Sequence, residues 1–281
     1  MSLITPISGN RADSENKSYI LGTGETAAMR LRLLHEVYGK STESLLTTLG
    51  LQQGMRIADI GCGIGVVSRW MAENVGTQGS VVGVDISTAQ LAIAQQDASL
   101  LGLTQLSFQQ ADVYDTGLPR GSFDMVYCRF LLCHLTQPEK ALQEMYTLLK
   151  PGGILLCDDL HLSSLHTDPP SAAYERMTKL MVGGGSHKGV DYNLGVKLHR
   201  LFRQVGFKNL QMQSDQPGYT VGECKRFWEY TFYEASAGAI QAGIFTVEDV
   251  EKLKAELEAV AKDETIMVTQ ARKVQVWAKK T

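Results

Sequence analysis

The sequence of 281 residues is poor in features that define several large protein classes. It has five cysteines, an odd number, and none of them forms a Cys-x-x-Cys pair, so neither a disulfide framework nor a cysteine zinc site is indicated. No apolar run approaches the ~20 residues of a membrane span, and the N-terminus lacks the apolar stretch of a signal peptide. We therefore expect a cytoplasmic chain with no membrane span, no disulfide and no metal centre.

A strong charge of either sign is also missing. The formal net charge is −3, so the chain as a whole offers no general attraction to nucleic acid. Lys197, His199, Arg200 and Arg203 form a small basic helix face, which we interpret as solvated. Because 44% of the residues are hydrophobic, the chain has enough apolar material for one large core, or for a core with an added cap.

What the sequence does have is a glycine-rich turn between two apolar stretches. Residues 59–65 read Asp-Ile-Gly-Cys-Gly-Ile-Gly, after an apolar run at 55–58 and before a predicted helix at 66–75. A second apolar run at 81–84 ends on Asp85. Glycines let the backbone approach a ligand closely, and an acid after the second strand can accept hydrogen bonds from ribose hydroxyls. The order of strand, turn, helix, strand and acid is typical of an adenosine-binding βαβ unit.

The glycine spacing separates the candidate cofactors. A nicotinamide or flavin fingerprint is G-x-G-x-x-G. Counted from Gly61, its third glycine would fall at Val66, whereas Gly65 comes one position early. No G-K-[ST] follows, so a P-loop is excluded. The spacing disfavours a dinucleotide and leaves the identity of the adenosine cofactor to the rest of the chain.

Three further segments follow the βαβ unit. A third predicted strand at 106–113 contains an acid near its end, and a fourth at 123–129 reads Phe-Asp-Met-Val-Tyr-Cys-Arg. A helix at 138–150 runs into Pro-Gly-Gly and a fifth strand at 154–158. The set resembles the class I S-adenosylmethionine-dependent methyltransferases. Their pattern is acid-x-G-x-G-x-G, acids after strands two and three, F-D-x-V in strand four and L-K-P-G-G before strand five. The resemblance covers residues 51–159.

The chain beyond strand five is less regular. Residues 160–195 contain three consecutive glycines at 183–185, so we expect an irregular insertion with a short helix at 172–181. A sixth strand is predicted at 207–213. Residues 219–245 carry seven aromatic side chains. Together with residues 160–195, they are expected to form a largely apolar cavity in which Phe227, Trp228 and Tyr230 contact the acceptor. The alternative is that these rings form the core of an added helical layer.

The resemblance implies an α/β fold with a doubly wound, seven-stranded, mostly parallel sheet, one antiparallel edge pair and helical lid insertions. We expect residues 1–50 to form an N-terminal tail and lid helices, and residues 51–281 to form the methyltransferase domain. Its insertions at about 160–195 and 219–245 would form a substrate cap. Ligands of such sheets bind beyond the carboxyl ends of the strands, which is where the glycine loop and the insertions meet.

The cofactor that the resemblance implies is S-adenosyl-L-methionine. The glycine loop, the end of strand four and an N-terminal aromatic ring would hold its methionine end, and the acids after strands two and three its ribose and adenine. The expected cofactor-binding set is Tyr19, Asp59, Gly61, Gly63, Asp85, Ile86, Gln90, Asp112, Val113, Cys128 and Arg129. Asp59 and Asp112 would also fit as turn formers at strand ends, and Gln90 as a solvated helix residue.

Methyl transfer from a sulfonium requires alignment of acceptor, methyl and sulfur in a dry site. Some acceptors also need a base to remove a proton. The candidates are Asp158, Asp159 and His161 near strand five and His134 near strand four, and each would also fit a structural role.

The function that we expect is methylation of a small-molecule acceptor at oxygen, nitrogen or an activated carbon. The slightly acidic charge balance and insertions of a size suited to a closed cavity favour it. The alternatives are a methyltransferase acting on a macromolecule, either protein or RNA, and a non-catalytic S-adenosylmethionine-binding scaffold. No paired cysteines lie on one rim element, which speaks against arsenite capture by thiolates. We expect no nucleic-acid partner.

Overall fold

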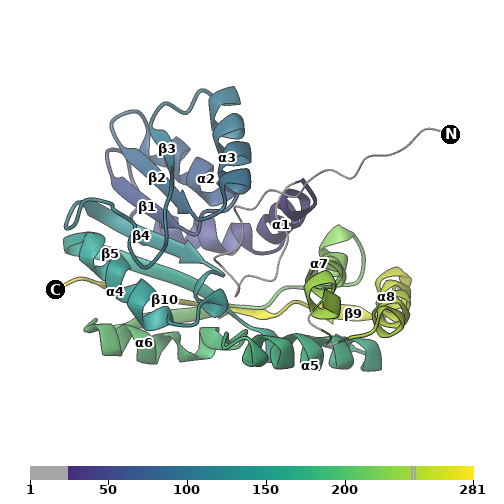
Figure 1. Ribbon diagram of the computed structural model, residues 1–281. Helices are drawn as coiled ribbons and strands as arrows, with labels where there is room; N and C mark the ends of the chain where they lie inside the picture. The colour runs from purple at the N-terminus through teal and green to yellow at the C-terminus, as the bar shows by residue number, and fades with distance from the viewer. Residues whose placement is uncertain (1–24, 242, 244) are drawn as a thin grey trace.

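The computed structural model describes residues 25–241, 243 and 245–281 (Figure 1). At its centre lies a seven-stranded sheet with the order β3 (Leu106–Gln110), β2 (Ser80–Asp85), β1 (Arg56–Ile60), β4 (Phe123–Arg129), β5 (Leu149–His161), β10 (Arg272–Lys279), β7 (Gln211–Asp215). The five neighbouring strands β3, β2, β1, β4 and β5 pair in parallel, and β10 runs antiparallel to β5 and β7. The doubly wound, mostly parallel α/β sheet predicted from the sequence is confirmed.

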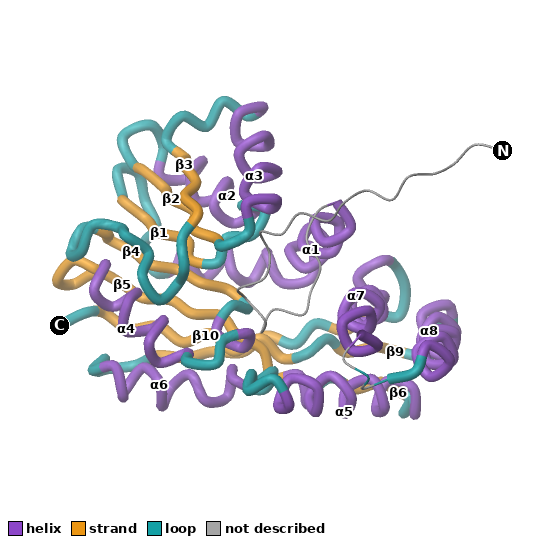
Figure 2. The backbone as a smooth tube through the Cα atoms, viewed as in Figure 1, coloured by secondary structure: helices purple, strands orange, loops and turns teal. Residues whose placement is uncertain are grey.

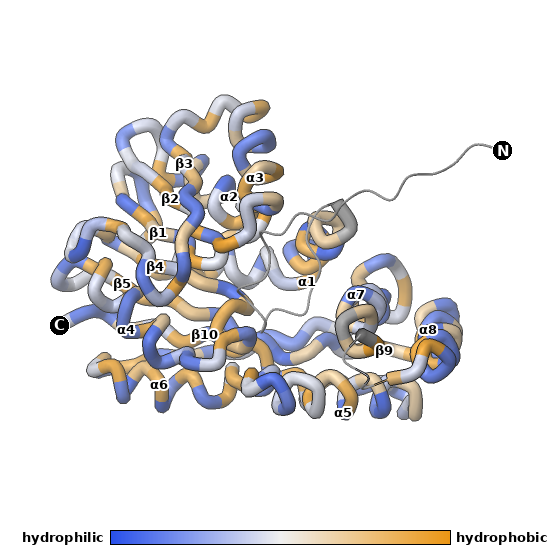
Figure 3. The backbone as a smooth tube through the Cα atoms, in the orientation of Figure 1, coloured by the Kyte–Doolittle hydropathy of each residue, from blue (hydrophilic) through white to orange (hydrophobic). Residues whose placement is uncertain are grey.

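Helices cover both faces of this sheet (Figure 2). One face packs against α2 (Val66–Val75), α3 (Thr88–Leu100) and the C-terminal half of α1 (Glu25–Thr48). The other face packs against α4 (Pro138–Leu148) and α6 (Leu198–Val205). Because both faces are covered, the central strands are apolar along most of their length (Figure 3). No helix in the described part of the chain is long and apolar enough to cross a membrane.

The chain beyond β5 adds a second layer next to the carboxyl ends of the strands. It contains a small antiparallel sheet in the order β6 (His166–Asp168), β9 (Met267–Thr269), β8 (Gly218–Tyr219). Its helices are α5 (Ala172–His187), α7 (Phe227–Gln241) and α8 (Val247–Lys262). The short 3₁₀ helices in the described residues are η1 (Leu132–His134), η2 (Leu162–Ser164), η3 (Leu194–Lys197) and η4 (Glu223–Arg226).

Three elements differ in extent from their predictions. The described part of residues 1–50 holds one continuous helix, α1, where several were expected. The short helix expected at 172–181 is present as α5, but it continues through the glycines at 183–185, because its apolar residues pack into the core cluster. The strand expected at 207–213 is β7, and it begins at Gln211 because Phe207 is buried against Phe202 of α6.

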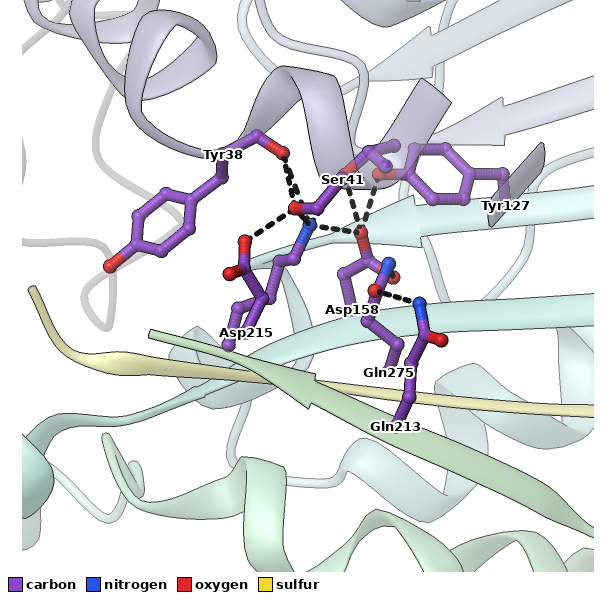
Figure 4. Close-up of polar contacts among 9 residues, drawn as sticks. Tyr38, Ser41, Tyr127, Asp158, Gln213, Asp215 and Gln275 are labelled. Atoms are coloured by element: carbon purple, nitrogen blue, oxygen red, sulfur yellow. Dashed lines mark hydrogen bonds and ion pairs between the residues drawn. The ribbon is translucent and has the colours of Figure 1, made fainter. Parts of the chain in front are cut away.

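A buried polar cluster joins α1 to the sheet (Figure 4). Lys273 Nζ donates to Tyr38 O at 3.1 Å, Ser41 Oγ at 2.7 Å and Thr42 Oγ1 at 2.9 Å. The same ammonium lies 3.7 Å from Asp158 Oδ2, and both charged side chains are completely buried. Burial lowers the pKa of Lys273, since a dry site disfavours its charge.

Asp158, one of the candidate bases, is fully occupied within this cluster. Its Oδ2 accepts from Thr42 Oγ1 at 2.8 Å and from the Tyr127 hydroxyl at 3.0 Å. Its Oδ1 accepts from Gln275 Nε2 at 2.9 Å, and Gln275 in turn accepts from Gln213 Nε2 at 2.8 Å. These contacts connect α1 with β4, β5, β7 and β10, so the cluster sets the position of α1 over the sheet.

Removing the ammonium should leave a buried carboxylate without its cation. We expect Lys273→Met to lower the free energy of unfolding by about 3 kcal/mol in urea denaturation, because breaking a buried ion pair costs more than the pair itself contributes. Lys279→Met on the same strand is the matched control, and its exposed side chain should change stability by less than about 0.5 kcal/mol. Equal effects of the two substitutions would contradict the role given to the cluster.

Candidate functional site

A cavity of about 260 Å³ lies at the carboxyl ends of β1, β2 and β4. Residues that follow strands line its rim: Gly61, Gly63, Asp85, Ile86, Asp112, Val113, Arg129 and Phe130. Helices α1, α5 and α7 form its roof with Arg30, Leu31, Leu34, Leu180, Met181, Phe227, Trp228 and Phe232. The cavity therefore has a polar rim built on the sheet and a mostly apolar roof built on the added helices.

The glycine loop has a backbone that other residues adopt poorly. Gly61 and Gly63 have φ values of +73° and +56°. A Cβ on Gly61 would lie 2.9 Å from the side chain of Leu131, so there is no room for one. The Gly61 and Cys62 amides both donate to Val84 O, at 2.7 and 3.0 Å. The loop is thus folded back onto the end of β2.

Asp85 holds the loop to the second strand. Its Oδ2 accepts from the Gly63 amide at 2.8 Å, and its Oδ1 accepts from the Ser87 amide at 2.9 Å. Burial raises the pKa of this carboxyl, although hydrogen bonds from the backbone oppose the shift. A carboxylate has roughly four lone-pair sites, so each oxygen keeps one for a ligand hydroxyl.

The neighbours of Asp85 extend the rim. Ile86 is a large apolar side chain that is 45% exposed at the cavity wall, where a flat apolar ring could cover it. Gln90 is buried and also lines the cavity, so it is not the solvated residue that one sequence interpretation allowed. Asp112 is exposed at the rim, and its Oδ1 accepts from the Tyr114 amide at 2.9 Å.

Two members of the expected cofactor-binding set do not line the cavity. Asp59 is buried behind the loop, where Ser68 in α2 donates to its Oδ2 at 2.5 Å, and burial raises its pKa to about 6. Cys128 is completely buried with its Sγ 3.3 Å from Cys157 Sγ on the neighbouring strand. The hydrogen bond with Cys157, together with burial, raises the pKa of the Cys128 thiol. A third member, Tyr19, lies outside the described residues.

The candidate bases are in different environments. Asp159 is completely buried, accepts from the Cys133 and Leu160 amides at 3.0 and 2.9 Å, and does not line the cavity. Burial raises its pKa to about 7. His161, at the end of β5, also lies outside the cavity lining.

His134 does line the cavity. Its ring packs edge-on against Tyr192, with centroids 5.4 Å apart. Burial, helped by the charge of Arg30, lowers its pKa to about 4. The imidazole is therefore neutral at neutral pH and has the protonation state that a base requires.

The aromatic segment 219–245 divides between the cavity and the scaffold. Phe227, Trp228, Phe232 and Phe245 line the cavity. Tyr230 and Tyr233 do not, because their hydroxyls donate to Glu223 at 2.7 Å and Glu229 at 2.8 Å. Phe227 and Trp228 line the cavity as expected, whereas Tyr230 lies outside its lining and, like Tyr233, packs around α7.

Sequence analysis missed Arg30, which lines the cavity from α1. Its side chain is 6% exposed, and its Nε donates to Glu234 Oε2 in α7 at 2.6 Å. Nothing in the local sequence marks this arginine, because its role depends on a partner 204 positions away.

Comparisons with known proteins agree with the fold and the loop. Residues 58–157 match the family model described as a methyltransferase domain. Phosphoethanolamine N-methyltransferase 3 of Arabidopsis thaliana is 32% identical over 136 residues, covering 48% of this chain and 27% of that protein. The arsenite methyltransferase of Aquipseudomonas alcaligenes is 30% identical over 182 residues, covering 61% of this chain and 49% of that protein. The chain thus spans about half the length of these curated relatives, or less.

A solved structure extends the likeness beyond the matched domain. The YcgJ protein of Bacillus subtilis has the same fold with a TM-score of 0.58 and 19% sequence identity, covering 86% of this chain and 99% of that one. The strand order of the sheet and the glycine loop are consistent with the match of residues 58–157 to the methyltransferase domain. Residues 58–157 therefore match a methyltransferase domain, and the sheet that contains them has the same fold as the YcgJ protein.

Proposed function

We propose that this chain binds S-adenosyl-L-methionine in the cavity and transfers its methyl group to a small-molecule acceptor. The observation that carries the proposal is that one cavity combines a polar rim with an apolar roof. The rim contains the glycine loop fastened to Asp85, and the roof of α1, α5 and α7 is largely apolar. When bound, S-adenosylmethionine would supply a methyl group that passes in line to the acceptor as its bond to sulfur breaks and S-adenosylhomocysteine leaves.

The rim residues fit this cofactor. Asp85 offers one free lone pair on each oxygen to the ribose hydroxyls, and Ile86 offers an apolar face to the adenine. Gly61 and Gly63 leave the space over the loop free of side chains. Asp59, behind the loop, would act indirectly by tying the start of α2 to β1 through Ser68.

The roof residues have a different task. Leu180, Met181, Phe227 and Phe232 come from segments 160–195 and 219–245, which we propose as the acceptor cap. An apolar cap excludes water, and a dry site favours a reaction in which the charge of the sulfonium disappears. His134, neutral and at the cavity wall, is our candidate for removing a proton from the acceptor.

The alternatives receive less support. A protein or RNA acceptor would need an open approach, whereas helices from three segments roof this cavity. Both curated relatives are named for small acceptors, phosphoethanolamine and arsenite. Cys128 and Cys157 do form a close pair, but both are completely buried and neither lines the cavity, so we do not propose arsenite capture.

The five cysteines are free thiols, which supports a reducing, cytoplasmic location.

The cofactor assignment is tested by titration calorimetry with S-adenosylhomocysteine and NAD. We expect S-adenosylhomocysteine to bind and NAD not to bind measurably. Asp85→Ala should weaken the complex by about 1.5–3 kcal/mol, because two ribose hydroxyls lose a charged acceptor and Gly63 loses its anchor. Asp115→Ala, an exposed acid outside the cavity lining, is the control and should bind like the wild type. NAD binding without S-adenosylhomocysteine binding would refute the proposal.

The neutral state of His134 is tested through stability. Its folded pKa of about 4 lies below the ordinary 6.5, so the unfolded chain takes up this proton first as the pH falls. The stabilisation is fully present above pH 6.5 and is lost as the pH approaches 4. Between pH 7 and pH 4.5, the wild type should therefore lose on the order of 2 kcal/mol more unfolding free energy than His134→Gln. Parallel pH curves for the two proteins would show that His134 is not held neutral.

A further inference from the structure

Two roof residues bring buried hydrogen-bond donors to the cavity without an acceptor for them. Arg30 uses Nε for Glu234, but its Nη2 is covered and has no partner among the residues that the structure describes. Trp228 is 3% exposed, and its indole Nε1 has no partner in the same part of the chain. Both side chains line the cavity. They come from α1 and α7, which are in contact.

Such donors are costly when they stay unpaired. A buried N–H group without an acceptor destabilises a fold by about 1–3 kcal/mol, and a charged donor by more. An arginine usually offers a carboxylate two parallel hydrogen bonds, whereas the Arg30–Glu234 pair has a single one. Among the described residues, the pair leaves Arg30 Nη2 and Glu234 Oε1 buried without partners. Of these two residues, Arg30 lines the cavity, so an oxygen atom of a bound ligand could accept from its unused donor.

The charges around the cavity favour an anionic oxygen. The acidic residues among the lining are Asp85 and Asp112, which belong to the cofactor rim. On the roof side, Arg30 and Lys188 are cationic, and Glu234 does not itself line the cavity. The charge of Arg30 is also felt at the imidazole of His134, where it helps to disfavour protonation. A protonated amine would meet unfavourable charge here, and a carboxylate or phenolate would be attracted.

We propose that the acceptor is an apolar small molecule with an anionic oxygen, carboxylate or phenolate, bound by Arg30 and Trp228. The remainder of the molecule would lie against the apolar roof formed by Leu162, Leu180, Met181, Phe232 and Phe245. This inference rests on the proposed function, because the rim must hold the cofactor for the roof to hold the acceptor. It narrows the acceptor class and makes cationic amines poor ligands.

The test uses three probes with one apolar body: phenylpropanoate, phenylpropanol and phenylpropylamine. Each is titrated into the full chain saturated with S-adenosylhomocysteine. We expect phenylpropanoate to bind at least about tenfold more tightly than phenylpropylamine, with the alcohol between them. Failure of the chain to bind S-adenosylhomocysteine would refute the proposed function itself. Normal S-adenosylhomocysteine binding with no preference for the carboxylate would refute only the anionic acceptor.

Variants of Arg30 and Trp228 test whether their N–H groups cause the preference for phenylpropanoate. Trp228→Phe keeps an aromatic ring and removes the N–H, so phenylpropanoate affinity should fall about threefold or more while phenylpropanol affinity is unchanged. Arg30→Met combined with Glu234→Gln removes the ion pair without stranding a buried carboxylate, and should abolish the preference for the carboxylate over the amine.

Arg32→Met, a mostly exposed arginine on the same helix, is the matched control and should keep the full preference. Circular dichroism and thermal unfolding establish that each variant is folded. The inference is overturned if the Arg30/Glu234 variant still prefers the carboxylate. It is also overturned if that variant loses S-adenosylhomocysteine affinity instead, since Arg30 would then belong to the cofactor site.

Discussion

The buried contact between Lys273 and Asp158 is the constraint on which the candidate site depends. It holds the C-terminal half of α1 through Ser41 and Thr42, whose hydroxyls accept from the ammonium. Because a helix is stiff, fixing this half also directs the N-terminal half over the ends of β1 and β4. Arg30, Leu31 and Leu34 then reach the cavity. The roof is therefore positioned by charges that lie outside the cavity itself.

The two halves of the cavity are built by different physical means. The rim uses backbone groups and short-range hydrogen bonds, as in the contact of Gly63 with Asp85, and its shape follows from the order of the strands. The roof is built by helices that pack across long sequence distances, as in the contact of Arg30 with Glu234. Because the rim and the roof are built by different contacts, the roof can change without altering the rim.

The same division decides what could be predicted from the sequence. Gly61, Gly63 and Asp85 could be predicted from the local sequence. A tight turn with positive φ requires glycine, and a carboxylate at the end of a buried strand is costly unless it accepts hydrogen bonds. The Cys128–Arg129 backbone was expected to face the cofactor, and Arg129 does line the cavity, whereas the Cys128 side chain is buried because neighbouring residues of a strand face opposite ways. Arg30 had no local signal at all. Tertiary packing also overrode the glycines at 183–185, which lie within α5.

The measurement that bears most directly on the proposed site is a crystal structure of the full chain grown with S-adenosylhomocysteine. We expect both ribose hydroxyls within hydrogen-bonding distance of Asp85, the adenine against Ile86, and the sulfur facing His134 at the cavity wall and Trp228 in the roof. The Arg30–Glu234 contact should remain, with the cavity under Trp228 still open to a second ligand. A ribose bound away from Asp85, or a cofactor that fills the space under the roof, would contradict the division of the cavity into a cofactor rim and an acceptor roof.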